Sequence, residues 1–333
     1  MLQALKPAEL NARNKRIFSL IIKISILVLA FWFIVNKLTN NNDLNDFQKL
    51  IQNLSPESVY GTLSIVFLFM LLNWFLEALK WKFLVRPIQR ISTWKAVQSV
   101  FCGLTIAVFT PNRIGEYGGR VFFLAPRKRV FGIAAMAVGA IGQMVITNIL
   151  GALAIVWFVW KFMEIGFWLN QALFFIAVLF SLFFIIFFFN IHWLYRLLSS
   201  IRFLKKFRKF FRIFSRYRKK ALLKVFLFSL ARFAVFTAQY CLLITLLLPG
   251  LPLFPMVMMI FILFFIQSAL PSLDLLDIGV RSMTAAYFFS YLTDQEIAIM
   301  ASTACVWFVN LIIPAVLGSV FVFKLNFFGT DNR

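Results

Sequence analysis

The sequence predicts an all-α membrane protein that crosses the bilayer several times, and two observations carry this prediction. Of the 333 residues, 62% are hydrophobic and only 14% are charged. Six apolar runs are long enough to cross a bilayer as helices, which takes about 20 residues each. These runs are Ile17–Asn36, Ser58–Leu79, Phe131–Trp160, Gln171–Phe189, Ala221–Leu248 and Ile297–Phe323. We therefore expect about six full transmembrane helices in a single integral membrane domain, residues 1–333.

The basic residues of the chain set its predicted orientation. The formal net charge is +22, but the cations gather in short loops beside apolar runs, as the positive-inside rule requires. Nucleic acid is not an expected partner, because the chain has no folded basic domain that could bind it. The distribution of charge predicts that both termini lie in the cytoplasm, and we expect the membrane to be a bacterial inner membrane.

The most basic loop, residues 196–220, holds eleven Lys or Arg and no acid. Its phenylalanines recur at helical spacing, which predicts a helix lying in the headgroup plane and attracting anionic lipid. Those phenylalanines are Phe203, Phe207, Phe210, Phe211 and Phe214. The alternative is that the charges only fix the topology.

Two further apolar segments are too short for a crossing. Ala96–Phe109 precedes a polar stretch containing Pro111, and Met256–Leu270 precedes one containing Pro271. A single crossing by the first segment would place the most basic loop outside the cell. Two re-entrant helical hairpins keep every basic loop in the cytoplasm, and such irregular backbone survives in a membrane when protein or water surrounds it.

The two polar stretches repeat one pattern, an acid and an arginine separated by x-Gly-x. It reads Glu116-Gly118-Arg120 in the first stretch and Asp277-Gly279-Arg281 in the second, and the arginines are 161 positions apart. Asn148 and Asn310, each in an apolar run, are 162 positions apart. With the hairpins opening to opposite sides, this predicts inverted-topology repeats at about residues 58–160 and 221–323, an architecture common in transporters.

We expect the two hairpins to meet in one central site for an anion. Arginines near a helix start suit a phosphate, and an arginine deep in a span usually faces a cavity or a carboxylate. The predicted phosphate-binding residues are Arg120, Arg281, Arg113 and Arg232. The predicted charge-balancing or proton-carrying acids are Glu116, Asp277 and Asp274.

Other residues are expected to shape this site. The predicted hairpin breaks are Pro111, Gly115, Gly118, Pro271 and Gly279, and the predicted supporting polar side chains are Asn148, Asn310 and Gln143. The alternative is that the acid–arginine pairs only pin the hairpin tips. No metal and no cofactor is expected, because the three cysteines lie in apolar runs without a CxxC spacing.

The motif Pro111-x-x-x-Gly115-Glu116, with Arg120 following and a short apolar segment before it, resembles the membrane domain of lysylphosphatidylglycerol synthases. The resemblance covers about residues 15–325. The second half resembles its glycine-containing counterpart but lacks the usual downstream Glu, near which Met283 or Thr284 stands. The resemblance implies movement of a phospholipid or polyprenyl-linked lipid between leaflets, without the separate aminoacyl-transfer domain of the synthases.

Three functions are consistent with these features. The leading expectation is a lipid flippase or transporter with membrane lipids as its partners, and not an enzyme. An intramembrane enzyme acting on lipid phosphate is the first alternative, although the only histidine, His192, lies at the end of a span. A membrane regulator that recruits anionic lipid through residues 196–220 is the second.

Overall fold

The computed structural model describes residues 54–108, 110, 113–203, 208–269 and 277–322, and these are helical with short connections. Five helical stretches in this part of the chain are long and apolar enough to cross a membrane. They are α3 (Pro56–Val85), Pro126–Phe162 with α6 (Arg129–Phe162), α7 (Phe167–Phe189), α10 (Lys219–Leu247) and Glu296–Val322. They coincide with five of the six predicted spans, while Ile17–Asn36 lies outside the described residues.

The last of these stretches is not one regular α-helix. It consists of α13 (Glu296–Trp307), a π-helical turn η5 (Phe308–Ile312) and α14 (Ile313–Val322). A π-helical turn inside an α-helix is rare and frequently marks a functional site. Asn310 lies in the middle of this turn.

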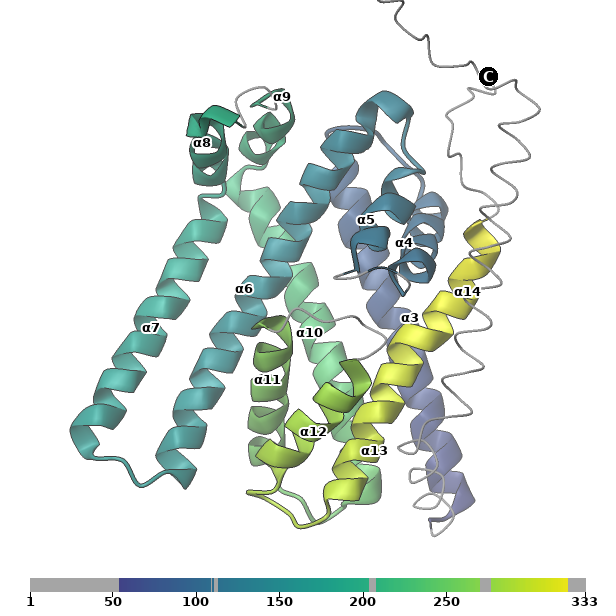
Figure 1. The fold of residues 1–333 in the computed structure, drawn as a ribbon. Coiled ribbons are helices and arrows are strands. Elements are labelled where there is room, and N and C mark those ends of the chain that lie inside the picture. The colour runs from purple at the N-terminus through teal and green to yellow at the C-terminus, as the bar shows by residue number, and fades with distance from the viewer. Residues whose placement is uncertain (1–53, 109, 111–112, 204–207, 270–276, 323–333) are drawn as a thin grey trace, which may run out of the picture.

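Two pairs of shorter helices stand where hairpins were predicted. The first pair is α4 (Thr93–Ala107) with α5 (Ile114–Val121), and the second is α11 (Leu253–Ala269) with α12 (Asp277–Phe289). The helices of each pair pack against each other. In Figure 1 the first pair lies toward the upper end of the bundle and the second toward the lower end.

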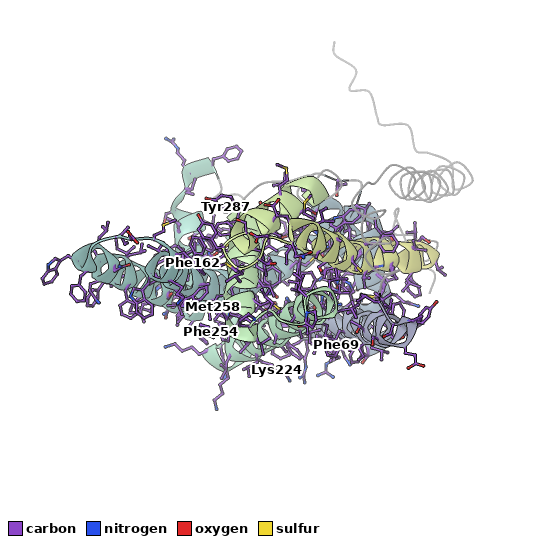
Figure 2. All side chains as sticks on the ribbon, turned by 90° about the horizontal axis from the view of Figure 1, so that it is seen from below. Phe69, Phe162, Lys224, Phe254, Met258 and Tyr287 are labelled. Carbon is purple, nitrogen blue, oxygen red and sulfur yellow. The ribbon has the colours of Figure 1, made fainter. Side chains whose placement is uncertain are left out.

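Each half of the chain packs one of its short helices against a long helical stretch of the other half. Helix α4, from the first half, packs against α14 of the second, and α11, from the second half, packs against α6 of the first. Helices α3 and α10 pack against each other. Viewed from below, the bundle has an elongated cross-section, with α7 at one end and α3 and α14 at the other (Figure 2).

Glycines allow the closest of these approaches. A Cβ atom on Gly318 of α14 would lie 2.0 Å from the Phe101 carbonyl oxygen of α4. A Cβ on Gly119 of α5 would lie 2.5 Å from the Cα of Gly103 on α4. Because a backbone atom cannot move aside as a side chain can, larger residues here would push the helices apart.

The predicted single helix over residues 196–220 is wrong. The chain there forms α8 (His192–Ser200), α9 (Arg208–Phe211) and a 3-10 turn η4 (Arg212–Arg216), all at the upper end of the bundle in Figure 1. Phe203 is 73% exposed, whereas Phe214 is buried in the core. The end of this segment packs on α3, where the Tyr217 hydroxyl donates to the Leu84 carbonyl oxygen (2.6 Å), one of the last carbonyls of that helix.

Candidate functional site

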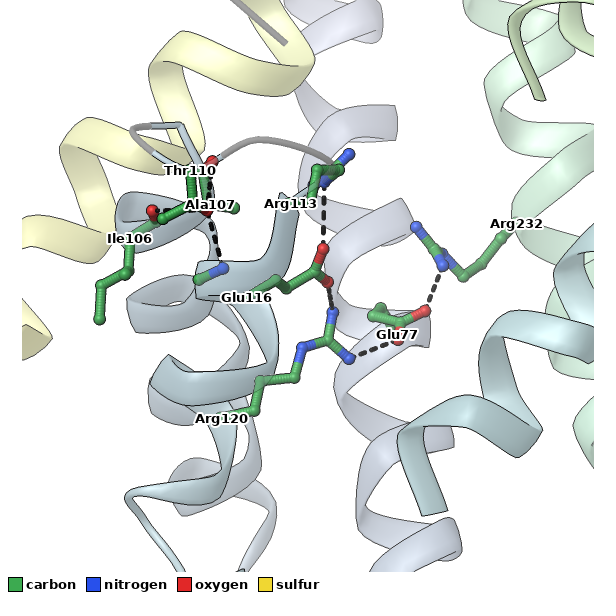
Figure 3. Close-up of polar contacts among 9 residues, drawn as sticks. Glu77, Ile106, Ala107, Thr110, Arg113, Glu116, Arg120 and Arg232 are labelled. Carbon is green, nitrogen blue, oxygen red and sulfur yellow. Dashed lines mark hydrogen bonds and ion pairs between the residues drawn. The ribbon is translucent and has the colours of Figure 1, made fainter. Parts of the chain in front are cut away.

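A buried carboxylate on α3, that of Glu77, joins three helices. It pairs with Lys80 Nζ at 2.8 Å on its own helix and with Arg120 Nη1 of α5 at 2.6 Å. Its other ion pair is with Arg232 of α10 (Figure 3). Glu77 and Arg120 are 6% and 3% exposed, so these are interior ion pairs. Such pairs depend on every partner being present, because an unpaired buried charge is costly.

A second carboxylate extends this network. Glu116 pairs with Arg120, one helical turn later, as its spacing predicted, and with Arg113 Nε at 3.1 Å. Two carboxylates thus face four cations, Lys80, Arg113, Arg120 and Arg232. We refer to these six side chains as the ion-pair network.

The turn into α5 places Arg113 in this network. Arg113 has a left-handed backbone conformation (φ 55°), which few residues other than glycine adopt. Thr110 Oγ1 accepts a hydrogen bond from the Gly115 backbone N–H at 2.7 Å. A Cβ on Gly115 would lie 2.5 Å from the Ile106 carbonyl oxygen, so this glycine lets the turn fold back on α4.

Trp74 and Asn73 of α3 hold the Arg232 guanidinium beside Glu77. Arg232 Nε donates to Asn73 Oδ1 at 3.0 Å, and its Cζ lies 5.2 Å from the centre of the Trp74 ring. Arg113 Cζ lies 6.0 Å from the same ring. Both guanidinium groups are therefore within the range of a cation–π interaction with one indole.

A cavity of about 340 Å³ lies between the two halves of the chain. Arg113 at the start of α5, Arg232 of α10 and Arg281 of α12 all line it. An adjoining cavity of about 510 Å³ shares Trp74, Arg113, Gln143, Thr147, Arg232 and Ser268 with the first and is also lined by Arg120. The four predicted phosphate-binding arginines thus line two adjoining cavities.

Amide side chains supply further polar groups to the smaller cavity. Gln143, Gln267 and Asn310 line it, and Arg281 Nη1 donates to Gln267 Oε1 at 3.1 Å. Within the described residues, Gln143 Oε1, Gln267 Nε2 and Asn310 Oδ1 are buried without a hydrogen-bond partner. A buried polar atom without a partner costs about 1–3 kcal/mol, so a ligand or water that satisfied these atoms would be stabilised there.

Several predicted site residues have a different place. Asn148 is buried on α6 but is not among the residues that line the two cavities. Gly118 lies within α5 and Gly279 within α12, so they are not hairpin breaks, whereas Gly115 lies in the first turn of α5 and allows it to fold back on α4. Pro111, Pro271, Asp274 and the Asp277 side chain lie outside the described part of the chain.

Glu77 was not among the predicted site residues. A carboxylate in an apolar run is by itself a signal of a functional site, and Asn73 lies one helical turn before it. The nearby Lys80 suggests a local pair, and this pair forms, but it conceals the longer-range partners Arg120 and Arg232. Gln267 was also not predicted, since it lies in the short apolar run before the second polar stretch and outside the acid–arginine motif.

Comparison with known proteins assigns the chain to a family. No curated protein and no solved structure matched it. The family model described as "Lysylphosphatidylglycerol synthase TM region" matches residues 20–318, which is most of the chain. Together with its apolar helices, this match shows that the chain is a multi-pass membrane protein of the lysylphosphatidylglycerol synthase TM region family, a membrane domain associated with lipid handling.

Proposed function

We propose that this protein moves an anionic, phosphate-bearing lipid, a phospholipid or a polyprenyl-linked lipid, between the leaflets of its membrane. The observation that carries the proposal is the central cavity lined by Arg113, Arg232 and Arg281, which come from three different helices. Guanidinium groups bind phosphate oxygens through paired, charge-assisted hydrogen bonds. The volume of the cavity, about 340 Å³, is within the usual range for a small ligand, here the headgroup.

Glu77 provides a way to bind and release such a headgroup. It is shared by Lys80, Arg120 and Arg232, so a phosphate can take over the Arg232 guanidinium while Glu77 keeps two cations. The phosphate would thereby avoid leaving a buried carboxylate unpaired. When the headgroup leaves, Glu77 restores the pair, which lowers the cost of the empty site.

The proposal includes two re-entrant hairpins arranged as inverted repeats. Its support is the exchange of contacts, in which α4 packs on α14 and α11 packs on α6. Alternating access then follows from rocking one half against the other around the central cavity. We also place the basic end of the bundle, with α8 and α9, in the cytoplasm.

Transport is proposed without covalent chemistry, and a vesicle assay tests it. The purified protein is reconstituted in vesicles carrying fluorescent phosphatidylglycerol, and dithionite bleaches the probe in the outer leaflet. We expect Arg232→Gln and Arg281→Gln to slow leaflet exchange at least tenfold, since each loses a cavity cation. Arg127→Gln, which removes an exposed cation near the start of α6, is the matched control and is expected to exchange at the wild-type rate.

Size-exclusion profiles would show that the variants remain folded. Wild-type exchange by both cavity variants would contradict the proposed site. A fluorescent phosphatidylcholine probe separates the substrate class, because its compensating positive charge is expected to make exchange slower than that of the anionic probe.

A further inference from the structure

A separate pocket of about 590 Å³ lies beside α3 and α10. It is formed by the last turns of α3, the turn at residues 86–91 and the first half of α10. It shares no lining residue with either central cavity. Anything bound there would not occupy the proposed transport site.

Four cations line this pocket, and no carboxylate is among its lining residues. They are Lys82, Arg86, Arg90 and Lys224. Within the described residues none of the four forms an ion pair with an acid. Lys82 Nζ donates to Thr93 Oγ1 at 2.8 Å. The pocket therefore concentrates positive charge, which favours an anion.

The floor of the pocket is apolar. Leu79 and Phe83, one helical turn apart on α3, line it together with Phe228 of α10. Lys224 Nζ lies 5.1 Å from the centre of the Phe83 ring, so the cation rests over this floor. Figure 2 shows Lys224 at the edge of the bundle, where α10 is open to its surroundings. Leu227, on the next turn of α10, is 53% exposed and extends the apolar surface.

Contacts from two sides hold the turn that carries Arg86 and Arg90. The Tyr217 hydroxyl donates to the Leu84 carbonyl oxygen at 2.6 Å, and the Ala125 N–H donates to Gln89 Oε1 at 3.1 Å. Ile91 at the end of the turn is buried. The arginines thus stand on a fixed backbone, which reduces the entropy lost when they bind a ligand.

We propose that this pocket is a binding site for an anionic phospholipid of the leaflet at the basic end of the bundle. Its headgroup phosphate contacts Arg86, Arg90 and Lys224, and an acyl chain lies along Leu79, Phe83 and Phe228. A free phosphate would use the cations but not the apolar floor. The bound lipid bridges α3 and α10, the two helices that carry Glu77 and Arg232 toward the centre.

Lipid retention by the purified protein tests this proposal. The protein is held in a non-ionic detergent, short-chain phosphatidylglycerol is titrated in, and bound lipid and unfolding temperature are measured. The test variant is Arg86→Gln/Arg90→Gln/Lys224→Gln. The control is Arg127→Gln/Lys128→Gln/Arg202→Gln, which removes three exposed cations that line none of the pockets described above. Both variants lose the same net charge.

We expect the test variant to lose one of the lipids that the wild type binds, its affinity for phosphatidylglycerol at this pocket falling at least tenfold, and with it the stabilisation that this lipid gives. The control is expected to keep both. Equal weakening in the two variants would overturn the proposal, because it would show binding to the whole basic surface. Equal retention in both would overturn it as well.

Two further measurements complete the test. If the test variant does not fold, the single substitution Arg86→Glu, at an exposed position after the end of α3, is expected to weaken binding to the same degree. Inorganic phosphate and glycerol phosphate are added as competitors, and we expect neither to displace the lipid at equal concentration. Displacement by either would assign the pocket to a soluble phosphate and overturn the lipid proposal.

Discussion

Substitution of Glu77 is the most direct test of the ion-pair network. Glu77→Gln removes one charge and leaves Lys80, Arg120 and Arg232 without their shared carboxylate. Removing one member of a buried pair costs about 3–5 kcal/mol, because the remaining charge is uncompensated. Arg120 retains Glu116, whereas Arg232 retains only Asn73 and the Trp74 ring among the described contacts. We therefore expect Glu77→Gln to lower the free energy of unfolding by several kcal/mol.

Arg232→Gln is the matched substitution on the opposite side of the pair. Here Glu77 keeps Lys80 and Arg120, so no carboxylate is left unpaired. The loss is then that of charge-assisted hydrogen bonds, about 1.5–3 kcal/mol. The order of the two effects, Glu77→Gln larger than Arg232→Gln, follows from the sharing of one acid by three cations.

Reversible unfolding in mixed detergent micelles gives both free energies. The double variant Glu77→Gln/Arg232→Gln closes a thermodynamic cycle, and its loss is expected to be smaller than the sum of the single losses. If Arg232→Gln lowers the free energy of unfolding more than Glu77→Gln does, Glu77 is not the shared partner on which the network depends. Additive losses would show that the two side chains do not interact in the folded protein.

Three other predictions concern packing and topology. Gly119→Ala is expected to destabilise the protein by about 1–3 kcal/mol, because its Cβ would meet the α4 backbone. Gly118→Ala is expected to be neutral or stabilising, because its Cβ has room. Thermal unfolding of the two variants compares these effects. Gly318→Ala is expected to lower folded yield more than either, since its Cβ would lie 2.0 Å from a carbonyl oxygen of α4. Single cysteines at residues 126–128 and 163–166 are expected to react with impermeant reagents from opposite sides of the membrane, because α6 joins these segments. Labelling of both segments from the same side would show that α6 does not span the membrane.

The fold was largely predictable because the membrane simplifies the relation between sequence and structure. Long apolar runs must form helices, since an unpaired backbone polar group in lipid is too costly. Charge parity then separated the short segment Ala96–Phe109 from the full spans, and the structure makes it a short helix folded back with α5. The basic segment was less predictable, because Phe214 and Tyr217 are buried by tertiary contacts that no local pattern reveals.

The four arginines of the predicted site line the two central cavities, whereas most of their ion-pair partners were not predicted. The depth of Arg232 in its apolar run indicated a cavity or a carboxylate, and the structure gives it both. The identity of that carboxylate depended on how α3 and α10 pack, and positions 155 apart in the chain have no spacing rule. The arginine repeat likewise indicated two equivalent residues, yet Arg120 is enclosed by Glu77 and Glu116 while Arg281 lines the smaller cavity.

The different surroundings of Arg120 and Arg281 are related to the contact between α3 and α10. If inverted repeats brought identical residues together there, like charges would face each other at the contact. Here α3 presents Glu77 and α10 presents Arg232, so the contact is an ion pair. Arg120, which is paired with Glu77, lines only the larger cavity, whereas Arg113 at the start of α5 lines both. In the proposed transport cycle, an anionic headgroup would compete with Glu77 for Arg232, and its binding would thereby be coupled to the contact between α3 and α10.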